Sequence, residues 1–177
     1  MRIIGGKHRG RVLTTFEGEA VRPTSDRARK ALFNVLQNEI FDSVFYDGFA
    51  GSGAVGLEAL SRGAKKVVLT DVSSESVKLT KANAALLKET PTILNVDCVS
   101  FLSSTDEKFD IIFLDPPDKK DDGELALKII AERDILSKEG VAVLEKDREG
   151  EKISGLDKQK IKKYGKAFFT FYKKKNV

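Results

Sequence analysis

The sequence is poor in the residues that mark several classes of protein. It has one Cys, one His and no Trp among 177 residues. A lone cysteine, Cys98, forms no internal disulfide and no cysteine-based zinc site, which is typical of proteins from a reducing compartment. No apolar run approaches the ~18 residues of a membrane-spanning helix, and the N-terminus lacks the apolar core of a signal peptide. We therefore expect a cytoplasmic protein that contacts no membrane and holds no metal.

The composition is that of a globular domain. Charged residues make up 33% of the chain and hydrophobic residues 41%, unlike a disordered or collagen-like chain. A chain of this length buries roughly two-thirds of its unfolded surface, which is enough for one packed core. We expect a basic hairpin and helix over residues 1–40 and the main domain over residues 41–177, with a monomer as the favoured state.

The net charge of +4 is unevenly distributed along the chain. Residues 1–30 carry eight Lys or Arg and three acids, and residues 151–177 carry nine Lys and two acids. The 120 residues between them have a net charge of −8. Basic ends suit contact with a polyanion, although most charge runs are solvated surface. Charge alone leaves both interpretations open.

Short apolar segments alternate with helical segments from residue 44 onward. Apolar runs predict strands at 44–46, 66–70, 92–96, 109–114 and 141–145, with helices near 54–62, 74–88, 98–103 and 123–133. Before them, residues 2–4 and 11–15 flank a glycine-rich turn, and a helix capped by Thr24 or Ser25 follows. Residues 158–175 predict an antiparallel hairpin that turns at 164–166. The alternation predicts an α/β fold with a Rossmann-like, doubly wound, mostly parallel sheet.

A glycine-rich turn follows the first predicted strand. Gly51, Gly53 and Gly56 match G-x-G-x-x-G where a strand leads into a helix, and glycine lets the backbone approach a ligand closely. Asp71 ends the next strand, 20 residues after Gly51. A carboxylate there is placed to accept hydrogen bonds from both ribose hydroxyls of a nucleoside-containing cofactor. The competing interpretation is a tight turn with Asp71 as a helix N-cap.

Two further acids bear on the identity of the cofactor. NAD and S-adenosylmethionine both bind at such turns, so the glycine pattern leaves both open. Asp47, at the end of the first strand, would repel a pyrophosphate but attract an ammonium group, which favours S-adenosylmethionine. Asp97 follows the third strand and has two interpretations, an acceptor for the adenine amino group or a helix N-cap.

The strand at 109–114 ends in Asp115-Pro116-Pro117. Consecutive prolines fix two φ angles and remove two N–H donors, which leaves a rigid edge rich in acceptors. The Asp115 carboxylate and the Pro116 carbonyl oxygen are both able to accept hydrogen bonds from an exocyclic amino group, turning its lone pair toward an electrophile. The alternative is a sharp strand exit with no chemical role.

Four segments together match one family pattern. They are residues 1–11 (MRIIGGKHRGR), 22–34 (RPTSDRARKALFN), 47–64 (DGFAGSGAVGLEALSRGA) and 114–117 (LDPP). In this order they resemble the bacterial RsmD family, S-adenosylmethionine-dependent methyltransferases that modify a guanine N2 of 16S ribosomal RNA. Asp-Pro-Pro is shared by many amino-group methyltransferases, so the two N-terminal segments carry the specificity. The resemblance implies S-adenosylmethionine as cofactor and 16S ribosomal RNA, or a partly assembled small subunit, as partner.

The resemblance also implies roles for individual residues. The implied cofactor-binding residues are Asp47, Phe49, Ala50, Gly51, Gly53, Asp71, Val72, Asp97, Cys98 and Asp115. Asp115, Pro116 and Pro117 would orient the guanine amino group for attack on the methyl group. The residues expected to contact RNA are Lys7, His8, Arg9, Arg11, Arg22, Thr24, Arg27 and Arg29. His8 is expected to be a surface contact rather than a metal ligand or a catalytic base.

Two positions depart from the family pattern. Asp118 stands where an aromatic residue able to stack on the target base is usual, and a carboxylate provides no stacking and repels a polyanion. Gly48 stands where a larger apolar residue is usual. Two other functions therefore stay open: an adenine-N6 methyltransferase of DNA or RNA, and a cofactor-binding, nucleic-acid-binding protein whose catalysis is impaired at Asp118.

Overall fold

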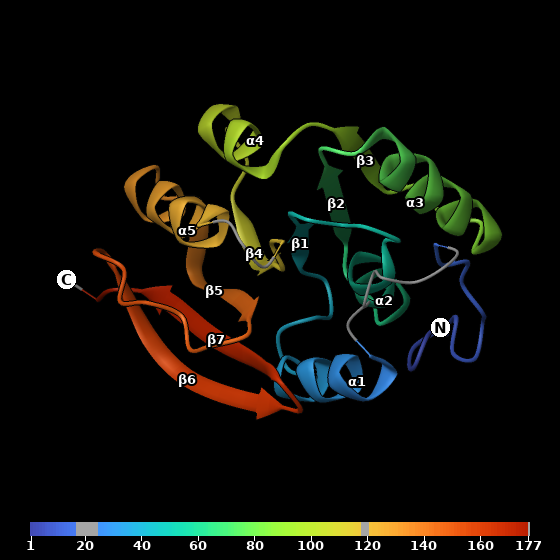
Figure 1. The fold of residues 1–177 in the computed structure, drawn as a ribbon, viewed down its shortest axis with the longest axis horizontal. Coiled ribbons are helices and arrows are strands. Elements are labelled where there is room, and N and C mark those ends of the chain that lie inside the picture. The colour runs from blue at the N-terminus through green and yellow to red at the C-terminus, as the bar shows by residue number, and fades with distance from the viewer. Residues whose placement is uncertain (17–24, 118–120, 177) are drawn as a thin grey trace.

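The computed structural model describes residues 1–16, 25–117 and 121–176, and a mixed sheet forms its centre (Figure 1). The strands are β1 Val44–Asp47, β2 Lys66–Asp71, β3 Thr92–Asn95, β4 Phe109–Leu114, β5 Leu136–Lys146, β6 Leu156–Tyr164 and β7 Ala167–Lys174. Their order in the sheet is β3-β2-β1-β4-β5-β7-β6. The first five strands are parallel, and β7 is antiparallel to both neighbours. The predicted doubly wound sheet with a C-terminal antiparallel hairpin is confirmed.

In the described part of the chain, five helices connect the strands or precede them. They are α1 Asp26–Val35, α2 Ala54–Ser61, α3 Ser74–Leu86, α4 Cys98–Ser104 and α5 Asp122–Glu132. The side chains of Ser25, Ser73 and Asp97 cap α1, α3 and α4 by accepting a hydrogen bond from a backbone N–H of the first turn. The four helices predicted after residue 44 agree within two residues at each end.

One strand begins earlier than predicted. The sequence indicated a strand at 141–145, but β5 starts at Leu136, where it pairs with Phe109. The register then shifts before Ile111 pairs with Val141. The intervening residues 137–140 are polar or glycine and half-buried to exposed for the most part. The irregular pairing leaves these residues partly outside the core. They therefore lack the apolar run that predicts the rest of the strand.

Helices cover both faces of the sheet. On one face, Leu32 and Phe33 of α1 and Val55 of α2 belong to one apolar cluster with residues of β1, β4, β5 and β7. On the other face, Leu102 of α4 and Leu127 of α5 belong to a second cluster. The central strands are therefore buried on both sides, which explains their continuous apolar sequences. The boundary predicted at residue 40 stays a prediction.

The N-terminal arm folds back on itself against α2 and α3. Arg2 and Val12 form one antiparallel bridge, and the Ile3 N–H donates to the Arg11 carbonyl oxygen at 2.9 Å. Ile3 and Leu13 pack in an apolar cluster with residues of α2 and α3. The expected basic hairpin is thus present as a single bridge rather than as two extended strands.

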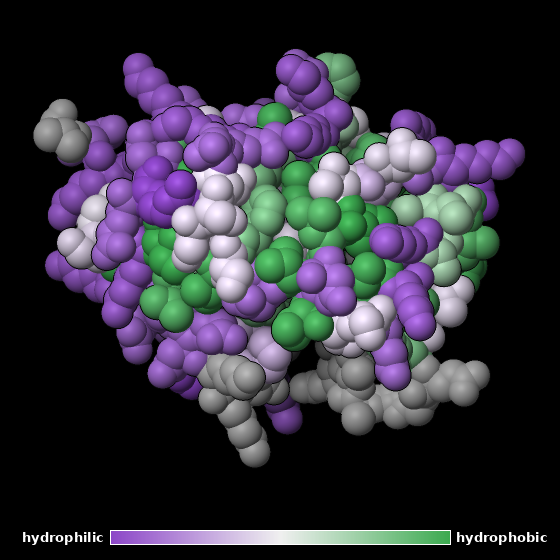
Figure 2. All heavy atoms as spheres, turned by 90° about the horizontal axis from the view of Figure 1, so that it is seen from above, coloured by the Kyte–Doolittle hydropathy of each residue, from purple (hydrophilic) through white to green (hydrophobic). Residues whose placement is uncertain are grey.

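The hairpin of β6 and β7 extends the sheet at the lower left of Figure 1. Its turn contains Gly165 with φ of 60°, a conformation that favours glycine. Because β7 is antiparallel to β5, this turn lies at the edge of the sheet where the parallel strands end. Figure 2 shows apolar side chains gathered in the middle of one face and hydrophilic side chains around them. Within the described ranges, no helix is both long and apolar enough to cross a membrane.

Candidate active site

A cavity of about 1200 Å³ opens where β1, β2 and β4 end. Asp47, Phe49, Ala50, Gly51, Asp71, Val72, Asp97, Cys98, Asp115, Pro116 and Pro117 all line it. These are the predicted cofactor-binding and catalytic residues with one exception, Gly53. Gly53 lies just behind the cavity as the N-cap of α2, with φ of 86°. Segments more than 60 residues apart in the sequence therefore converge on one site.

The glycine-rich loop is held in place by hydrogen bonds on both sides. The Gly51 N–H donates to Asp71 Oδ2 at 2.9 Å, and Thr80 Oγ1 donates to the Gly51 carbonyl oxygen at 2.8 Å. Gly51 has φ of 56°, and a β-carbon added there would meet no atom within 4 Å. The loop is therefore both fixed and open to the cavity, as the glycine pattern predicted.

Asp47 is a buried acid with one unused oxygen. Its Oδ2 accepts a hydrogen bond from the Gly56 N–H at 3.1 Å in the first turn of α2. Within the described part of the chain, Oδ1 is buried and has no hydrogen-bond partner. Burial, and to a smaller extent the nearby Asp71 carboxylate, raise the pKa of this carboxyl to about 7. A buried acceptor of this kind fits a positively charged donor.

Asp71 organises the next loop without capping α3. Its Oδ1 accepts a hydrogen bond from the Ser73 N–H at 2.9 Å, while Ser73 itself caps the helix. The interpretation of Asp71 as a helix N-cap is therefore wrong. The Asn95 side-chain amide, from β3, donates to the Asp71 carbonyl oxygen at 3.0 Å. Asp71 is half-buried and lines the cavity, as a ribose-binding acid would require.

Asp97 is the N-cap of α4. Its side chain accepts a hydrogen bond from the Ser100 N–H at 3.0 Å, and the hydrogen bonds to Ser100 lower the pKa of its carboxyl. The N-cap interpretation is thus confirmed for this residue. Asp97 also lines the cavity, so a contact with adenine stays a prediction.

Cys98 occupies the space next to Gly48. A β-carbon at position 48 would lie 2.7 Å from Cys98 Sγ and 3.1 Å from Leu114 Cδ2. Cys98 is buried, and burial raises the pKa of its thiol to about 12, which keeps it protonated and unreactive. The departure at position 48 therefore has a packing explanation, because the sulfur fills the volume that a larger residue would need.

The Asp115-Pro116-Pro117 edge leaves β4 at the cavity. Pro116 is buried and Pro117 is exposed, with Asp115 between these limits. Below it, Lys146 at the end of β5 donates to both carboxylate oxygens of Glu124 in α5, at 3.0 and 3.1 Å, and both side chains are almost fully buried. This ion pair fixes the first turn of α5 against the sheet. Lys146 and Glu124 lie 22 residues apart, and no sequence motif predicts that they pair.

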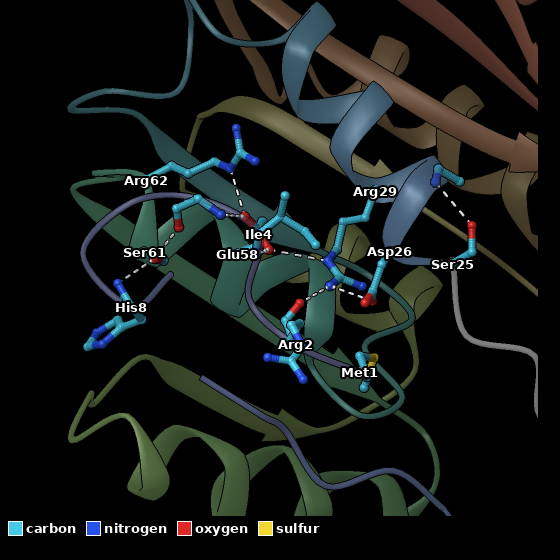
Figure 3. A network of polar contacts seen from close by, with 12 residues as sticks. Met1, Arg2, Ile4, His8, Ser25, Asp26, Arg29, Glu58, Ser61 and Arg62 are labelled. Atoms are coloured by element: carbon cyan, nitrogen blue, oxygen red, sulfur yellow. Dashed lines mark hydrogen bonds and ion pairs between the residues drawn. The ribbon is translucent and has the colours of Figure 1, made fainter. Parts of the chain in front are cut away.

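A second buried carboxylate, Glu58 of α2, joins three segments (Figure 3). It accepts hydrogen bonds from the N–H groups of Ile4 and Gly5 in the arm, at 3.0 and 2.9 Å. Arg29 Nε of α1 lies 3.2 Å from Oε1, and Arg62 Nε lies 2.7 Å from Oε2. Arg29 is 0% exposed. The prediction that Arg29 contacts RNA is therefore wrong, because its guanidinium is enclosed in this network.

The basic turn of the arm packs at the end of α2 away from the cavity. The Lys7 and His8 N–H groups donate to the Ser61 carbonyl oxygen and Oγ, both at 2.9 Å. Gly53 begins this helix at the cavity, so roughly 12 Å of helix separates the two ends. His8 Nε2 lies 2.6 Å from Glu89 Oε2, and only 15% of its side chain is exposed. His8 is therefore half-buried and held by Glu89, and its expected contact with RNA stays a prediction.

The other residues expected to contact RNA differ in their exposure. Lys7 is exposed but pairs with Glu89 at 2.8 Å, and Arg11 donates to the Leu86 carbonyl oxygen at 2.7 Å. Arg9 and Arg27 are exposed. Arg22, Thr24 and the departure at Asp118 lie outside the described residues. No cluster of His, Cys, Asp and Glu suited to a metal ion occurs within residues 1–16, 25–117 and 121–176.

Comparisons with known proteins place this chain in a family. The family model described as "Conserved hypothetical protein 95" matches residues 1–173. The chain is 37% identical to "Ribosomal RNA small subunit methyltransferase D" of Haemophilus influenzae over 84% of this chain and 80% of that protein. It is 32% identical to "Putative rRNA methyltransferase YlbH" of Bacillus subtilis, over 99% of this chain and 100% of that protein.

A solved structure agrees with these matches. "Putative methyltransferase yhhF" from Escherichia coli has a TM-score of 0.89 and 33% identity, covering 98% of this chain and 97% of that one. Similarity in sequence and in structure thus spans the arm, the cofactor-type loop and the C-terminal hairpin together. The chain therefore belongs to the conserved hypothetical protein 95 family, the RsmD-like family of S-adenosylmethionine-dependent ribosomal RNA methyltransferases.

Proposed function

We propose that this protein transfers the methyl group of S-adenosylmethionine to the exocyclic N2 amino group of a guanine in 16S ribosomal RNA. The observation that carries the proposal is a single cavity lined by Asp47, Asp71 and the Asp115-Pro116-Pro117 edge. The first two acids suit the charged and polar groups of the cofactor, and the third segment suits an amino group. Family membership supports ribosomal RNA as the substrate class.

The residues at one end of the cavity fit the cofactor. The unpartnered Oδ1 of Asp47 is a buried acceptor for the methionine ammonium group. Each Asp71 oxygen accepts one backbone hydrogen bond and keeps capacity for a ribose hydroxyl. Phe49, Ala50, Val72 and Cys98 supply apolar contacts along the same wall. Asp97 would accept a hydrogen bond from the adenine amino group while it also caps α4.

The residues at the other end suit the target amino group. S-adenosylmethionine supplies an electrophilic methyl group on a sulfonium. The Asp115 carboxylate and the Pro116 carbonyl oxygen would each accept a hydrogen bond from one N–H of the guanine amino group. These two hydrogen bonds would turn the nitrogen lone pair toward that methyl group. Attack would form the N–C bond while the bond between the methyl carbon and the sulfonium sulfur breaks. S-adenosylhomocysteine would leave, and the amino proton would pass to solvent. Because such positioning contributes several kcal/mol in intramolecular reactions, a strong base is unnecessary.

The test is methyl transfer from radiolabelled S-adenosylmethionine. The acceptors are small ribosomal subunits and protein-free 16S ribosomal RNA, both from a bacterial strain without its own enzyme of this family, and duplex DNA. We expect label in the RNA, at a guanine N2 by mass spectrometry of its nucleosides, and none in the DNA. The Asp115→Ala variant controls for contaminating activity.

Two other functions predict different outcomes. Label in adenine N6 of DNA or RNA would replace the guanine assignment with an adenine-N6 methyltransferase. Saturable binding of both S-adenosylmethionine and ribosomal RNA without label in any nucleic acid would indicate a binding protein without catalysis. A substrate base inside a duplex has to leave its stack to reach Asp115, so both RNA forms are tested.

A further inference from the structure

The C-terminal hairpin carries three lysines in and beside its turn. At the open end of the hairpin, Lys158 pairs with Glu149, and Lys174 Nζ lies 2.6 Å from Asp134 Oδ1. Among the ion pairs of the described residues, none involves Lys162, Lys163 or Lys166. These three residues, called the tip lysines below, are all exposed. Two lysines near the base of the hairpin are thus paired with acids, whereas the tip lysines are not paired with any described acid.

The tip lysines surround the turn rather than lying on one face. Lys162 is opposite Phe169 in the register and so shares its side of the sheet, the side that α1 covers. Lys163 lies on the other side, with Nζ 5.2 Å from the centroid of the Phe168 ring. Lys166 follows Gly165 in the turn itself. The three ammonium groups thus present positive charge in several directions around the tip.

The tip borders the cavity of the proposed active site. Tyr164, Gly165, Lys166 and Ala167 line that cavity, together with Ser25 and Ala28 at the start of α1. Figure 1 shows the turn of the red hairpin close to the blue helix α1. The basic turn of the N-terminal arm, in contrast, packs at the far end of α2. Lys166 of the tip therefore lines the cavity that holds the reacting edge, whereas Lys7 and His8 do not.

The cavity needs positive charge at its rim to admit a polyanion. The acids that line it are Asp47, Asp71, Asp97, Asp115, Asp122, Glu145 and Asp147. The described basic residues that line it are Lys146 and Lys166. Lys146 is buried and paired with Glu124, so its charge is already compensated. Lys166 is exposed, and with its two neighbours it offsets the repulsion between these acids and an incoming phosphate backbone.

We propose that Lys162, Lys163 and Lys166 bind phosphates of the substrate RNA beside the target guanine. The inference deepens the proposed function and rests on it. Exposed Arg27 and Lys30 of the neighbouring helix α1 would add further contacts to the same backbone. RNA is favoured over an acidic protein because the cationic tip borders the cavity that the base must enter. Such contacts supply salt-dependent affinity and position the strand, but they do not read sequence.

The experiment compares two triple variants of the full-length protein. One replaces the three tip lysines with alanine. The matched control, K65A/K128A/K138A, removes three exposed lysines that do not line the cavity and so changes the net charge equally. Affinity for protein-free 16S ribosomal RNA and for small subunits, both lacking the modification, is measured across a range of salt concentrations, together with affinity for S-adenosylmethionine.

We expect the tip variant to bind both RNA forms at least tenfold more weakly at about 0.1 M salt. The slope of log affinity against log salt should fall by about 2, since each lost phosphate contact contributes roughly 0.7 to 0.9. Affinity for S-adenosylmethionine should stay within about twofold, which shows that the fold is intact. The control variant should change the RNA affinity less than about threefold.

Four results would overturn the inference. Equal effects of the two triple variants would show that only overall charge matters. Normal binding of the tip variant to protein-free RNA with weakened binding to small subunits would assign the tip to a protein contact. If the wild-type protein methylates RNA but the tip variant has an unchanged salt slope, the tip lysines do not contact phosphates. That result would leave the proposed function standing. A wild-type protein that neither binds nor methylates RNA would reject the proposed function as well.

Discussion

Arg29 Nε lies 3.2 Å from Glu58 Oε1, and both side chains are fully buried. The same carboxylate holds two backbone amides of the N-terminal arm and Arg62. One acid thereby fixes the arm and α1 to α2, the helix whose first turn adjoins the cofactor loop. Buried charges persist only when they are paired and hydrogen-bonded. This network therefore determines where the start of α1 stands at the cavity mouth.

The Glu58→Ala substitution should lower the free energy of unfolding by about 3–5 kcal/mol, because among the described residues the buried Arg29 guanidinium would keep only the partly exposed Asp26 as an acidic partner. Urea denaturation followed by circular dichroism measures the change. The control is Glu107→Ala, which breaks the partly exposed pair with Lys66 and should cost less than about 1 kcal/mol. Similar losses in the two variants would show that the network carries no special stability.

The sheet could be predicted because its central strands are buried on both faces. Short, nearly continuous apolar runs such as 109–114 that alternate with helical segments indicate such strands, and the glycine turn and Asp-Pro-Pro edge both follow such runs. The carboxyl ends of parallel strands lie at the same edge of a sheet. Asp47, Asp71 and Asp115, which end or follow such strands, are therefore expected at that edge. That convergence follows from topology alone.

Long-range pairing could not be read from the sequence in the same way. Arg29 precedes Leu32 by three positions and Phe33 by four, so helical spacing places it on the same face of α1 as these buried residues. Its partner Glu58 comes from another helix, and no periodicity links the two residues. The sequence alone therefore favours an exposed position for Arg29. The pair of Lys146 and Glu124 could not be predicted either, because no periodicity links these two residues.

The contact between position 48 and Cys98 predicts a double-mutant cycle. Gly48→Ala should destabilise the protein by about 1–3 kcal/mol, because the new β-carbon meets Sγ at 2.7 Å. Replacing Cys98 with alanine removes that sulfur, so the same glycine substitution should cost at least about 0.5 kcal/mol less in the Cys98→Ala background. Denaturant unfolding of the four proteins measures the coupling. Strict additivity would contradict the packing explanation.

Asp71 and Asp115 should separate cofactor binding from transfer. Asp71→Ala should weaken S-adenosylmethionine binding by about tenfold or more, since hydrogen bonds to a charged acceptor contribute roughly 1.5–3 kcal/mol. Asp115→Ala should abolish methyl transfer and leave cofactor affinity within a few-fold. Calorimetry and single-turnover transfer to small subunits measure the two properties. Normal turnover by the Asp115 variant would refute the role of the acidic edge.

The raised pKa of Asp47 predicts two opposite pH dependences. Between its ordinary pKa near 3.8 and its folded pKa of about 7, the folded protein binds a proton that the unfolded chain does not. Stability of the protein without cofactor should therefore fall as pH rises through this window. The ionised carboxylate is the form that attracts an ammonium group, so affinity for S-adenosylmethionine should rise from about pH 6 to about pH 8.

The Asp47→Asn substitution should weaken cofactor binding and remove both pH dependences, because its side chain does not titrate. Asp97→Asn is the matched control: that carboxyl also lines the cavity, but hydrogen bonds to Ser100 keep its pKa low. It stays ionised across the same pH range, so its replacement should leave the pH profile of the wild-type protein intact. A profile that survives in Asp47→Asn would assign the titration to another group and separate Asp47 from the ammonium site.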